Sequence, residues 1–297
     1  MNTMTKNLIL SPFNLLYRLA PRQELELMFF LKQRYPLHLE DPKTFNEKLQ
    51  WIKLYDHNPL MPQCCDKFTV REFVKDMGCE DMLVDLLWEG YDPEQIPFDS
   101  LPDRFVVKVT HGSTFNIICT DKSKLDRADV IRKCKKWLKA KFLPCYGEWF
   151  YGKVRPRVIV EAFIESDDGQ PLKDYKVFCF NGQPRYIGVY SDRGEALRKD
   201  IFTTQWENVP YAHEGPATEE GSISRPACLE QLLEAAACLA KPFLHARVDF
   251  YIVKNKILFG EVTFTSGAGF NRYASYDFDL EMGSCLQLPQ KEGKGQA

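Results

Sequence analysis

The chain has 297 residues, of which 44% are hydrophobic and 27% charged, and its formal net charge is −2. This length is enough for one large domain or for two or three small lobes that share a cleft. The composition is ordinary for a globular protein, and the near-neutral charge argues against a broadly basic nucleic-acid-binding protein, so we expect no nucleic-acid partner.

The beginning of the chain, residues 8–19, is apolar but is interrupted by Pro12, Asn14 and Arg18. It is too short to span a bilayer and lacks a small-residue cleavage site. We expect a helix that docks on the protein or frays. The alternative is an interfacial helix that gives peripheral membrane association through the N-terminus.

The first 89 residues are expected to form an N-terminal helical region. Leu25, Met28 and Phe29 follow helical spacing. The sequence Thr44-Phe45-Asn46-Glu47 is a capping box, in which Thr44 accepts from the Glu47 amide while Glu47 reaches back, and it predicts a second helix start. The apolar spacing over residues 70–77 predicts a third helix. This region contains no recognisable catalytic constellation.

Residues 90–164 are expected to form a first lobe. Residues 90–104 are rich in Pro and Asp and are predicted to be a connector. Apolar runs at 105–109, 116–119 and 157–164 predict strands, and the pattern over 124–142 predicts a basic amphipathic helix.

Residues 165–288 are expected to form a second lobe, followed by a polar, disordered tail over 289–297. Asn181-Gly182 is a strong hairpin signal between the strands 175–180 and 184–189. Residues 227–241 predict a helix. A second hairpin is predicted around Lys254-Asn255, with strands over 247–253 and 256–265.

The ten cysteines form no disulfide framework, because Cys64 and Cys65 are adjacent and the others are widely scattered. No CxxC pair is present, and no histidine lies near a cysteine at zinc-finger spacing. Several cysteines lie inside apolar runs. We therefore expect reduced cysteines that pack as small hydrophobic residues, and a cytoplasmic protein.

Lys108 is unusual because it lies inside an apolar strand run and is followed by the loop His111-Gly112-Ser113-Thr114-Phe115. Small residues let backbone N–H groups approach phosphates, and a nearby ammonium neutralises them. The GxxxxGK[ST] pattern of a Walker A loop is absent. The alternative is a strand-edge lysine that reaches out to water.

The second hairpin places two carboxylates together. If its register runs symmetrically from Lys254-Asn255, Asp249 lies near Glu261, and Thr263 shares the face of Glu261. Two carboxylates on one sheet face repel unless a cation lies between them, and Mg²⁺ prefers such oxygens. The alternative is a structural ion pair of Arg247 with Asp249, with Glu261 exposed at an edge.

Glu161 ends a strand run and precedes Ala162-Phe163-Ile164. This pattern fits a hinge between lobes, where backbone groups bind an adenine edge and apolar side chains enclose the ring. The alternative is a solvent-facing glutamate at a strand end.

The order of these features resembles the ATP-grasp superfamily from about Phe105 to Gly283. More specifically, residues 45–51, 174–182 and 191–193 are similar to the TupA-like ATP-grasp family. The resemblance implies an α+β fold in which two lobes clasp ATP after an N-terminal helical region. Members of that family are linked to the synthesis of teichuronopeptide and other surface polysaccharides, and are often labelled glycosyltransferases.

The resemblance also implies roles for single residues. Lys108, with His111, Gly112 and Ser113, would contact nucleotide phosphates, and Glu161 to Ile164 would hold adenine. Asp174 falls at the usual position of a ribose-binding acid, and Lys176 would be a second phosphate-binding or structural cation. Asp249, Glu261 and Thr263 would hold Mg²⁺. Thr263 departs from the superfamily's usual Glu-x-Asn, so one metal ion and two metal ions remain alternatives.

Three further segments have two interpretations each. Arg193, Arg198 and Lys199, together with Arg247, could grip an anionic acceptor or acyl phosphate. Alternatively, Arg198 and Lys199 could lie in a solvated charged loop. Residues 266–269 could present backbone donors to a reacting carboxylate or simply turn the chain. The sequence at Asp277 and Asp279 has the Asp-x-Asp form used by nucleotide-sugar transferases, on which a glycosyltransferase would be built. It lacks a preceding strand, so it is interpreted as chance.

The sequence therefore predicts an ATP-dependent ligase that joins a carboxylate to an amine through an acyl phosphate, with Arg247, Lys176 and Arg193 as catalytic residues. Its partners would be a small-molecule or saccharide carboxylate, such as a uronic acid, and an amino acid or other amine. The rival interpretations are a glycosyltransferase, a kinase in the same cleft, and a protein that binds ATP without turnover.

Overall fold

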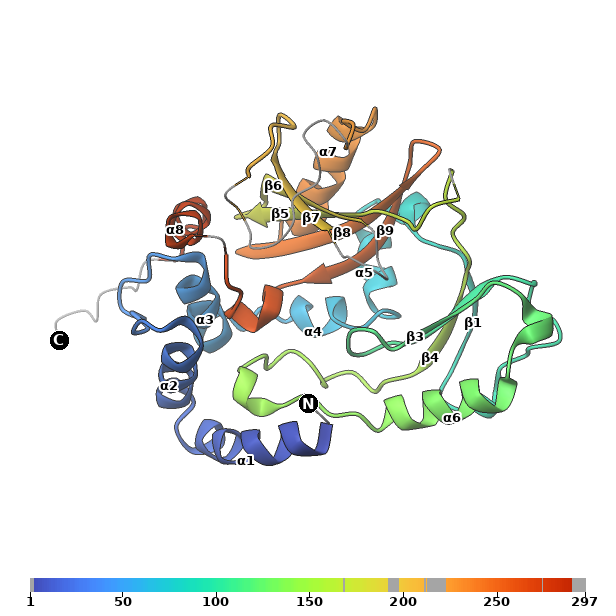
Figure 1. Cartoon of the computed structure of the whole chain (residues 1–297), viewed down its shortest axis with the longest axis horizontal. Coiled ribbons are helices and arrows are strands. Elements are labelled where there is room, and N and C mark those ends of the chain that lie inside the picture. The colour runs from blue at the N-terminus through green and yellow to red at the C-terminus, as the bar shows by residue number, and fades with distance from the viewer. Residues whose placement is uncertain are drawn as a thin grey trace.

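The computed structural model describes residues 3–167, 169–191, 198–210, 212, 223–273 and 275–289, without the side chains of residues 3–8. The fold is α+β. It contains a four-stranded antiparallel sheet in the order β1-β4-β2-β3 and a five-stranded antiparallel sheet in the order β7-β6-β5-β8-β9. Figure 1 shows the two sheets in separate lobes, with α4 and α5 running between them and α1 to α3 at one end.

The N-terminal region is helical, as the sequence predicts. Its helices are α1 (Thr3–Leu19), α2 (Pro21–Gln33), α3 (Phe45–Tyr55), α4 (Leu60–Cys64) and α5 (Val70–Asp76). The predicted capping box is present: the Glu47 amide donates to Thr44 Oγ1 over 3.2 Å, and the Thr44 amide donates to Glu47 Oε2 over 3.0 Å. These two bonds satisfy N–H groups that the first turn of α3 would otherwise leave open.

The first lobe is built on β1 (Leu86–Gly90), β2 (Phe105–Val109), β3 (Asn116–Cys119), β4 (Val158–Ala162) and α6 (Arg127–Leu138). Along β2, Phe105, Val107 and Val109 are buried in a core with α6. Because side chains alternate along a strand, Lys108 faces the other side of the sheet, toward the second lobe. β1 was not predicted, and the expected boundary between residues 89 and 90 falls inside it.

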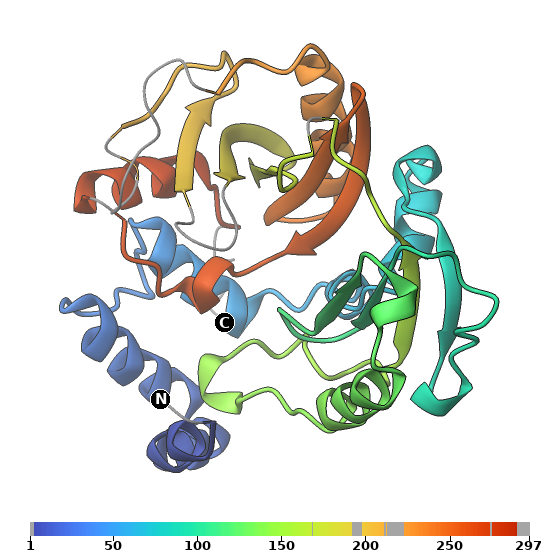
Figure 2. The same cartoon turned by 45° about the vertical axis from the view of Figure 1, so that its right-hand side comes forward.

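The second lobe contains β5 (Asp174–Phe180), β6 (Gln183–Ser191), β7 (Arg198–Thr203), β8 (His245–Val253) and β9 (Lys256–Thr263). α7 (Leu229–Ala240) covers the outer face of this sheet, and Figure 2 shows α6 in the matching outer position below the first sheet. Both predicted hairpins are present. Their turn residues Asn181, Gly182, Lys254 and Asn255 all have positive φ, as two-residue turns of this type require.

β7 contains two residues of the positively charged segment after the first hairpin, for which the sequence left two alternatives. Arg198 and Lys199 begin a strand that pairs with β6, rather than lying in a solvated loop. The Lys199 ammonium lies 5.5 Å from the centre of the Tyr190 ring. Arg193, the third member of the predicted cluster, lies outside the described residues.

Two separate hydrophobic cores hold the molecule together. One core combines the five-stranded sheet with α7, α8 (Tyr276–Cys285) and the N-terminal helices, and the other lies between the four-stranded sheet and α6. The helical region therefore packs with the second lobe. Asp279 of α8 joins the two by accepting from the Asn46 amide at 3.0 Å and from Asn46 Nδ2 at 2.8 Å. This structural role agrees with the interpretation of Asp277 and Asp279 as a chance motif.

None of the ten cysteines forms a disulfide bond, as predicted. Among the helices of the described residues, none combines the length and the apolar character that crossing a membrane requires.

Candidate functional site

Three adjoining cavities line the interface between the lobes. The apolar cavity, of about 510 Å³, is lined by residues that include Val106, Lys108, Glu161 to Ile164 and Tyr251. A narrow cavity shares Lys108 and Glu161 with it and is also lined by Lys67, Arg71 and Gly260. The polar cavity, of about 290 Å³, shares Lys67 and Gly260 with the narrow one and extends to Arg247, Glu261, Glu148 and the loop at 266–269. Together the three cavities form one cleft.

Lys108 and Glu161 lie at the narrowest part of this cleft, where the four-stranded sheet presents both side chains on one face. Lys108 Nζ lies 2.5 Å from Glu161 Oε2, and Arg71 Nη1 lies 3.3 Å from Glu161 Oε1. Glu161 is buried, whereas the Lys108 side chain keeps 24% of its exposure. Lys108 and Glu161, which the sequence predicts as site residues, thus form an ion pair that faces the cleft.

The apolar cavity has the character of a site for a flat ring. Ala162, Phe163 and Ile164 line it, as the hinge prediction requires, and Tyr251 contributes from the second lobe. The Arg104 guanidinium lies 4.0 Å from the centre of the Phe163 ring and covers one face of it.

Lys67 was not predicted, although it lines both the narrow and the polar cavity. Its ammonium donates to the Gly112 carbonyl over 2.7 Å, and its amide donates to the Thr110 carbonyl over 3.0 Å. Both bonds fix the loop between β2 and β3, in which Gly112 and Thr114 have positive φ. Burial lowers the pKa of Lys67, opposed by nearby Glu261. No spacing in the sequence marks this lysine, because its partners lie more than forty residues away.

The predicted loop residues are divided between the cleft and the interior. Gly112 and Ser113 line the polar cavity. His111 lies beneath them: its Nε2 is 3.0 Å from the Ala140 carbonyl, and its ring packs against Phe115 and Phe142. His111 therefore supports the loop in this structure rather than facing the cleft.

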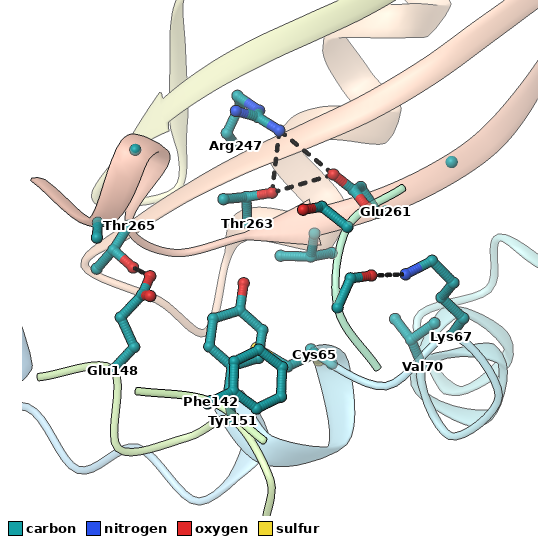
Figure 3. Close-up of a pocket in the computed structure, with 17 residues that line it drawn as sticks. Cys65, Lys67, Val70, Phe142, Glu148, Tyr151, Arg247, Glu261, Thr263 and Thr265 are labelled. Atoms are coloured by element: carbon teal, nitrogen blue, oxygen red, sulfur yellow. Dashed lines mark hydrogen bonds and ion pairs between the residues drawn. The ribbon is translucent and has the colours of Figure 1, made fainter. Parts of the chain in front are cut away.

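The wall of the polar cavity formed by β8 and β9 contains Arg247, Glu261 and Thr263 (Figure 3). Arg247 binds both oxygens of Asp249, with Nε–Oδ1 at 2.7 Å and Nη2–Oδ2 at 2.8 Å, and reaches Glu261 Oε1 at 3.4 Å and Thr263 Oγ1 at 3.0 Å. Burial opposes its charge, but the carboxylates of Asp249 and Glu261 raise the pKa of Arg247 above its usual range. The arginine is therefore a fixed cation.

A β-bulge decides which side chains share this wall. The symmetric register expected from the Lys254-Asn255 turn would place Asp249 opposite Gly260 and turn Glu261 to the other face of the sheet. The pairing of β8 with β9 instead shifts by one residue between Asp249 and Phe250, so that Asp249 pairs with Glu261. The predicted proximity is confirmed, but its cause is the bulge, which re-aims Glu261.

Lys176 and Asp174 lie deeper than the sequence prediction implied. Lys176 is buried, forms an ion pair with Asp249 Oδ2, and lies 3.7 Å from Asp174 Oδ2. Burial opposes ionisation of Asp249, but Arg247 and Lys176 together hold the pKa of that carboxyl below its usual value. In this structure Lys176 is thus a buried partner of Asp249, and Asp174 is a buried neighbour of it.

The opposite wall of the polar cavity comes from the segment between α6 and β4, which the sequence did not single out. Phe142 and Tyr151 stack with ring centres 4.4 Å apart, and the Tyr151 hydroxyl points toward Thr263 (Figure 3). Glu148 accepts a hydrogen bond from Thr265 Oγ1 at one end of the cavity. Burial raises the pKa of Glu148, opposed by that hydrogen bond and by the Lys53 ammonium.

The loop Ser266–Gly269 forms the floor of the polar cavity. Gly267, Ala268 and Gly269 all have positive φ. Helix α3 holds the loop in this conformation, because Gln50 Nε2 donates to the Gly269 carbonyl over 2.6 Å and Lys53 Nζ donates to the Ala268 carbonyl over 2.9 Å.

The donor set fits Mg²⁺ in part. The Glu261 side chain is 43% exposed and brings carboxylate oxygens to the cavity, and the Thr263 hydroxyl lies beside it. Asp249 also has the right chemistry, but both of its oxygens already accept from cations. Glu261 is therefore the residue best placed to bind a metal ion directly.

The polypeptide matches the family model of the TupA-like ATP-grasp proteins over residues 47–287. The chain belongs to this family. The match begins within α3 and includes α4, α5, both sheets and all three cavities. The suspected resemblance and the ATP-grasp fold are thereby confirmed. A comparison with curated protein sequences gave no match.

Several solved structures are similar to this family member at low sequence identity. They include a D-alanine–D-alanine ligase from Bacillus anthracis (19% identity, 74% of this chain and 66% of that chain, TM-score 0.46). An L-amino acid ligase from Bacillus licheniformis (15%, 85% and 57%, 0.46) and an N5-carboxyaminoimidazole synthase from Aspergillus clavatus (12%, 78% and 54%, 0.45) also match. The chain spans two thirds or less of the length of these structures.

Proposed function

We propose that this ATP-grasp protein is an ATP-dependent ligase that joins a carboxylate to an amine through an acyl phosphate. The observation that carries the proposal is the continuous cleft, which leads from an apolar cavity, past three cations, to a polar cavity with a fixed arginine. Membership of the ATP-grasp family supports the assignment of the cleft to ATP.

The nucleotide would lie along the first two cavities. Ala162, Phe163 and Ile164 would enclose the adenine, and Lys108 and Lys67 would neutralise the phosphates. Lys108 is already paired with Glu161, so the pair holds its ammonium at the entrance to the narrow cavity before the nucleotide binds. The terminal phosphate would then reach the polar cavity.

Glu261, with Thr263 beside it, would hold Mg²⁺, and Asp249 could join only by giving up part of its contact with Arg247 or Lys176. When bound, the metal ion would offset the negative charge of the phosphate oxygens. Arg247 supplies a second, permanent positive charge facing the same space, where it would bind the substrate carboxylate and the charge that develops during transfer.

The reaction itself requires little covalent chemistry from the protein. The carboxylate would attack the terminal phosphorus of ATP, ADP would leave, and an amine would displace phosphate to give an amide. The loop at Gly112 and Ser113 and the loop at 266–269 lie on two sides of the polar cavity and would limit the access of water to the acyl phosphate. We propose a saccharide carboxylate, such as a uronic acid, and an amino acid as substrates, in keeping with the surface-polysaccharide role expected of the family.

Mass spectrometry of products tests this proposal. The protein would be incubated with ATP, Mg²⁺ and each pair from a panel of uronic acids, including glucuronate and galacturonate, and amino acids. We expect ADP, phosphate and an amide product only when both substrates are present. A stable phosphorylated hydroxyl product would make the protein a kinase, and consumption of a sugar nucleotide in place of ATP would make it a glycosyltransferase. ATP binding without any turnover would support a non-catalytic role.

A further inference from the structure

The polar cavity has an end that the nucleotide side of the cleft does not reach. Lys67 and Gly260 connect it to the narrow cavity, whereas Glu148 and Thr265 lie on the side of the cavity away from Lys67 (Figure 3). The end at Glu148 is therefore open for a second substrate when phosphates occupy the end at Lys67.

The side chains at this end have unused hydrogen-bonding capacity. Thr265 occupies Oε1 of Glu148, and Oε2 has no hydrogen-bond partner among the described residues. The Tyr151 hydroxyl likewise has no partner in the part of the chain that the structure describes, and it points into the cavity. Both groups are partly buried where they line this cavity, and a charge-assisted hydrogen bond is stronger there than in water.

The charges of the two walls differ. Arg247 faces the cavity from β8, and it suits an anionic carboxylate or acyl phosphate. Glu148 faces the same space from the segment between α6 and β4, and its carboxylate suits a cation. Phe142 and Tyr151 add an aromatic surface beside it, which also favours a cation.

We infer that Glu148 and Tyr151 form the subsite for the attacking amine, which binds there as a primary ammonium group across the cavity from Arg247. This inference rests on the proposed ligase function and names the acceptor's charge and its docking residues. Thr265 positions Glu148 by donating to Oε1, which leaves Oε2 for the ligand.

The same arrangement accounts for the protons of amide formation. The ammonium gives one proton to Glu148, and the freed lone pair of the nitrogen attacks the acyl carbon. The bond from that carbon to the phosphate oxygen breaks, and phosphate leaves with the electron pair and takes the second proton from nitrogen. The amide keeps one N–H, and Glu148 returns its proton to solvent. The raised pKa that burial gives Glu148 suits it to accept a proton.

Hydroxylamine provides the test, because it is uncharged at neutral pH and traps acyl phosphates as hydroxamates without needing an ammonium site. ADP release would be measured with ATP, Mg²⁺ and the best uronate of the panel, once with the amino acid and once with hydroxylamine. In Glu148→Gln we expect the rate with the amino acid, divided by the rate with hydroxylamine, to fall at least about tenfold. This is the scale of losing one charge-assisted hydrogen bond. Tyr151→Phe should lower the same ratio less.

Because both rates are measured on one preparation, partial unfolding cancels in the ratio, and Tyr151→Phe carries the test if Glu148→Gln does not fold. Glu230→Gln, an exposed glutamate on α7, is the matched control and should leave both rates unchanged. An unchanged ratio in both cavity variants would overturn the amine subsite and leave the ligase proposal standing. A wild-type protein that releases no ADP with either nucleophile would overturn the ligase proposal and the subsite with it.

Discussion

Lys108 and Arg247 are both held by carboxylates, but at different depths in the protein. The Lys108 side chain is 24% exposed and its partner Glu161 has a second cation in Arg71. Arg247 is 13% exposed and binds Asp249 through two nitrogen atoms. A ligand phosphate can therefore draw Lys108 away from Glu161 at modest cost, because Arg71 continues to neutralise that carboxylate, whereas Arg247 stays fixed.

Lys108→Ala should weaken ATP binding by about 1.5–3 kcal/mol, the scale of one hydrogen bond to a charged group. Isothermal titration calorimetry with MgATP measures this change directly. Lys75→Ala serves as the control, since Lys75 pairs with Glu80 outside the three cavities and should leave the affinity unchanged. Equal affinities for wild type and a folded Lys108→Ala protein would remove Lys108 from the site.

Arg247→Ala should reduce turnover far more than ATP affinity. The arginine faces the polar cavity rather than the apolar one, so its charge acts where the phosphoryl group would be transferred. Asp249 keeps Lys176 as a partner in this variant, which limits the loss of stability. Steady-state kinetics and calorimetry on the same preparation separate the two effects. Parallel loss of kcat and of ATP affinity would contradict a role confined to transfer.

At the scale of elements, the bulge at Gly260 is what assembles the carboxylate wall. A Cβ atom at residue 260 would lie 2.9 Å from the Asp249 carbonyl oxygen, so a larger residue forces the backbone to move. Only glycine allows this close approach of β9 to β8 at the position where the register shifts. The arrangement of Asp249 and Glu261 therefore depends on a residue without a side chain.

Gly260→Ala should lower the free energy of unfolding by about 1–3 kcal/mol, the usual cost of overpacking, and should abolish Mg²⁺-dependent turnover as Glu261 turns away from Asp249. Denaturant unfolding and ADP release measure the two effects. Lys256→Ala, at the exposed start of the same strand, is the control and should change neither. A variant with wild-type turnover would show that the bulge is not needed for the site.

The sequence could predict those parts of the site whose partners lie close along the chain. Asp249 and Glu261 belong to one hairpin, so the turn at Lys254-Asn255 was enough to predict that they lie near each other, although not to locate the bulge that puts them on one face. Glu148 was out of reach, because its partner Thr265 lies more than a hundred residues away in another lobe. β1 was missed for a similar reason: its pairing with β4 is long-range, and its sequence lies against a connector rich in Pro and Asp.

The helices α2 and α3 each bury an ionisable side chain, and the one on α2 should make stability depend on pH. Glu24 is fully buried, and neither of its carboxylate oxygens has a hydrogen-bond partner among the residues that the structure describes. Burial raises its pKa from 4.5 to about 7. Burial likewise lowers the pKa of Lys53 to about 7, with Glu148 and Glu24 opposing that shift. Folding thus favours the protonated form of Glu24 and the neutral form of Lys53.

For Glu24 the folded state binds more protons than the unfolded state between about pH 4.5 and pH 7, so its contribution to stability is present below pH 4.5 and is lost as pH rises to 7. Glu24→Gln should remove this decline. The unfolding free energy of the variant minus that of the wild type should therefore rise between pH 4.5 and pH 7, by at most about 3 kcal/mol. Urea unfolding at several pH values measures it. A difference that does not vary with pH would show that Glu24 does not titrate there.

At the scale of the whole molecule, the cleft lies between two hydrophobic cores that form separately. The five-stranded sheet shares its core with the N-terminal helices, and the four-stranded sheet has its own with α6. The residues that line the cavities come from both sides. Lys108 and Glu161 lie on the four-stranded sheet, and Glu261 and Tyr251 lie on the five-stranded sheet. A ligand that spans the cleft must therefore couple the two lobes.

MgATP should slow amide hydrogen exchange in both lobes at once. We expect protection in the loop at 110–115 and at 161–164 of the first lobe, and at 260–263 of the second, because these segments line the cleft from opposite sides. At a hundred times the dissociation constant, binding can stabilise the closed backbone by at most about 2.7 kcal/mol, roughly a hundredfold slower exchange. Hydrogen–deuterium exchange with mass spectrometry resolves these segments, and Lys108→Ala at the same MgATP concentration should lose most of the protection in both lobes. Protection confined to one lobe would mean that the nucleotide contacts one sheet only and does not couple the two lobes.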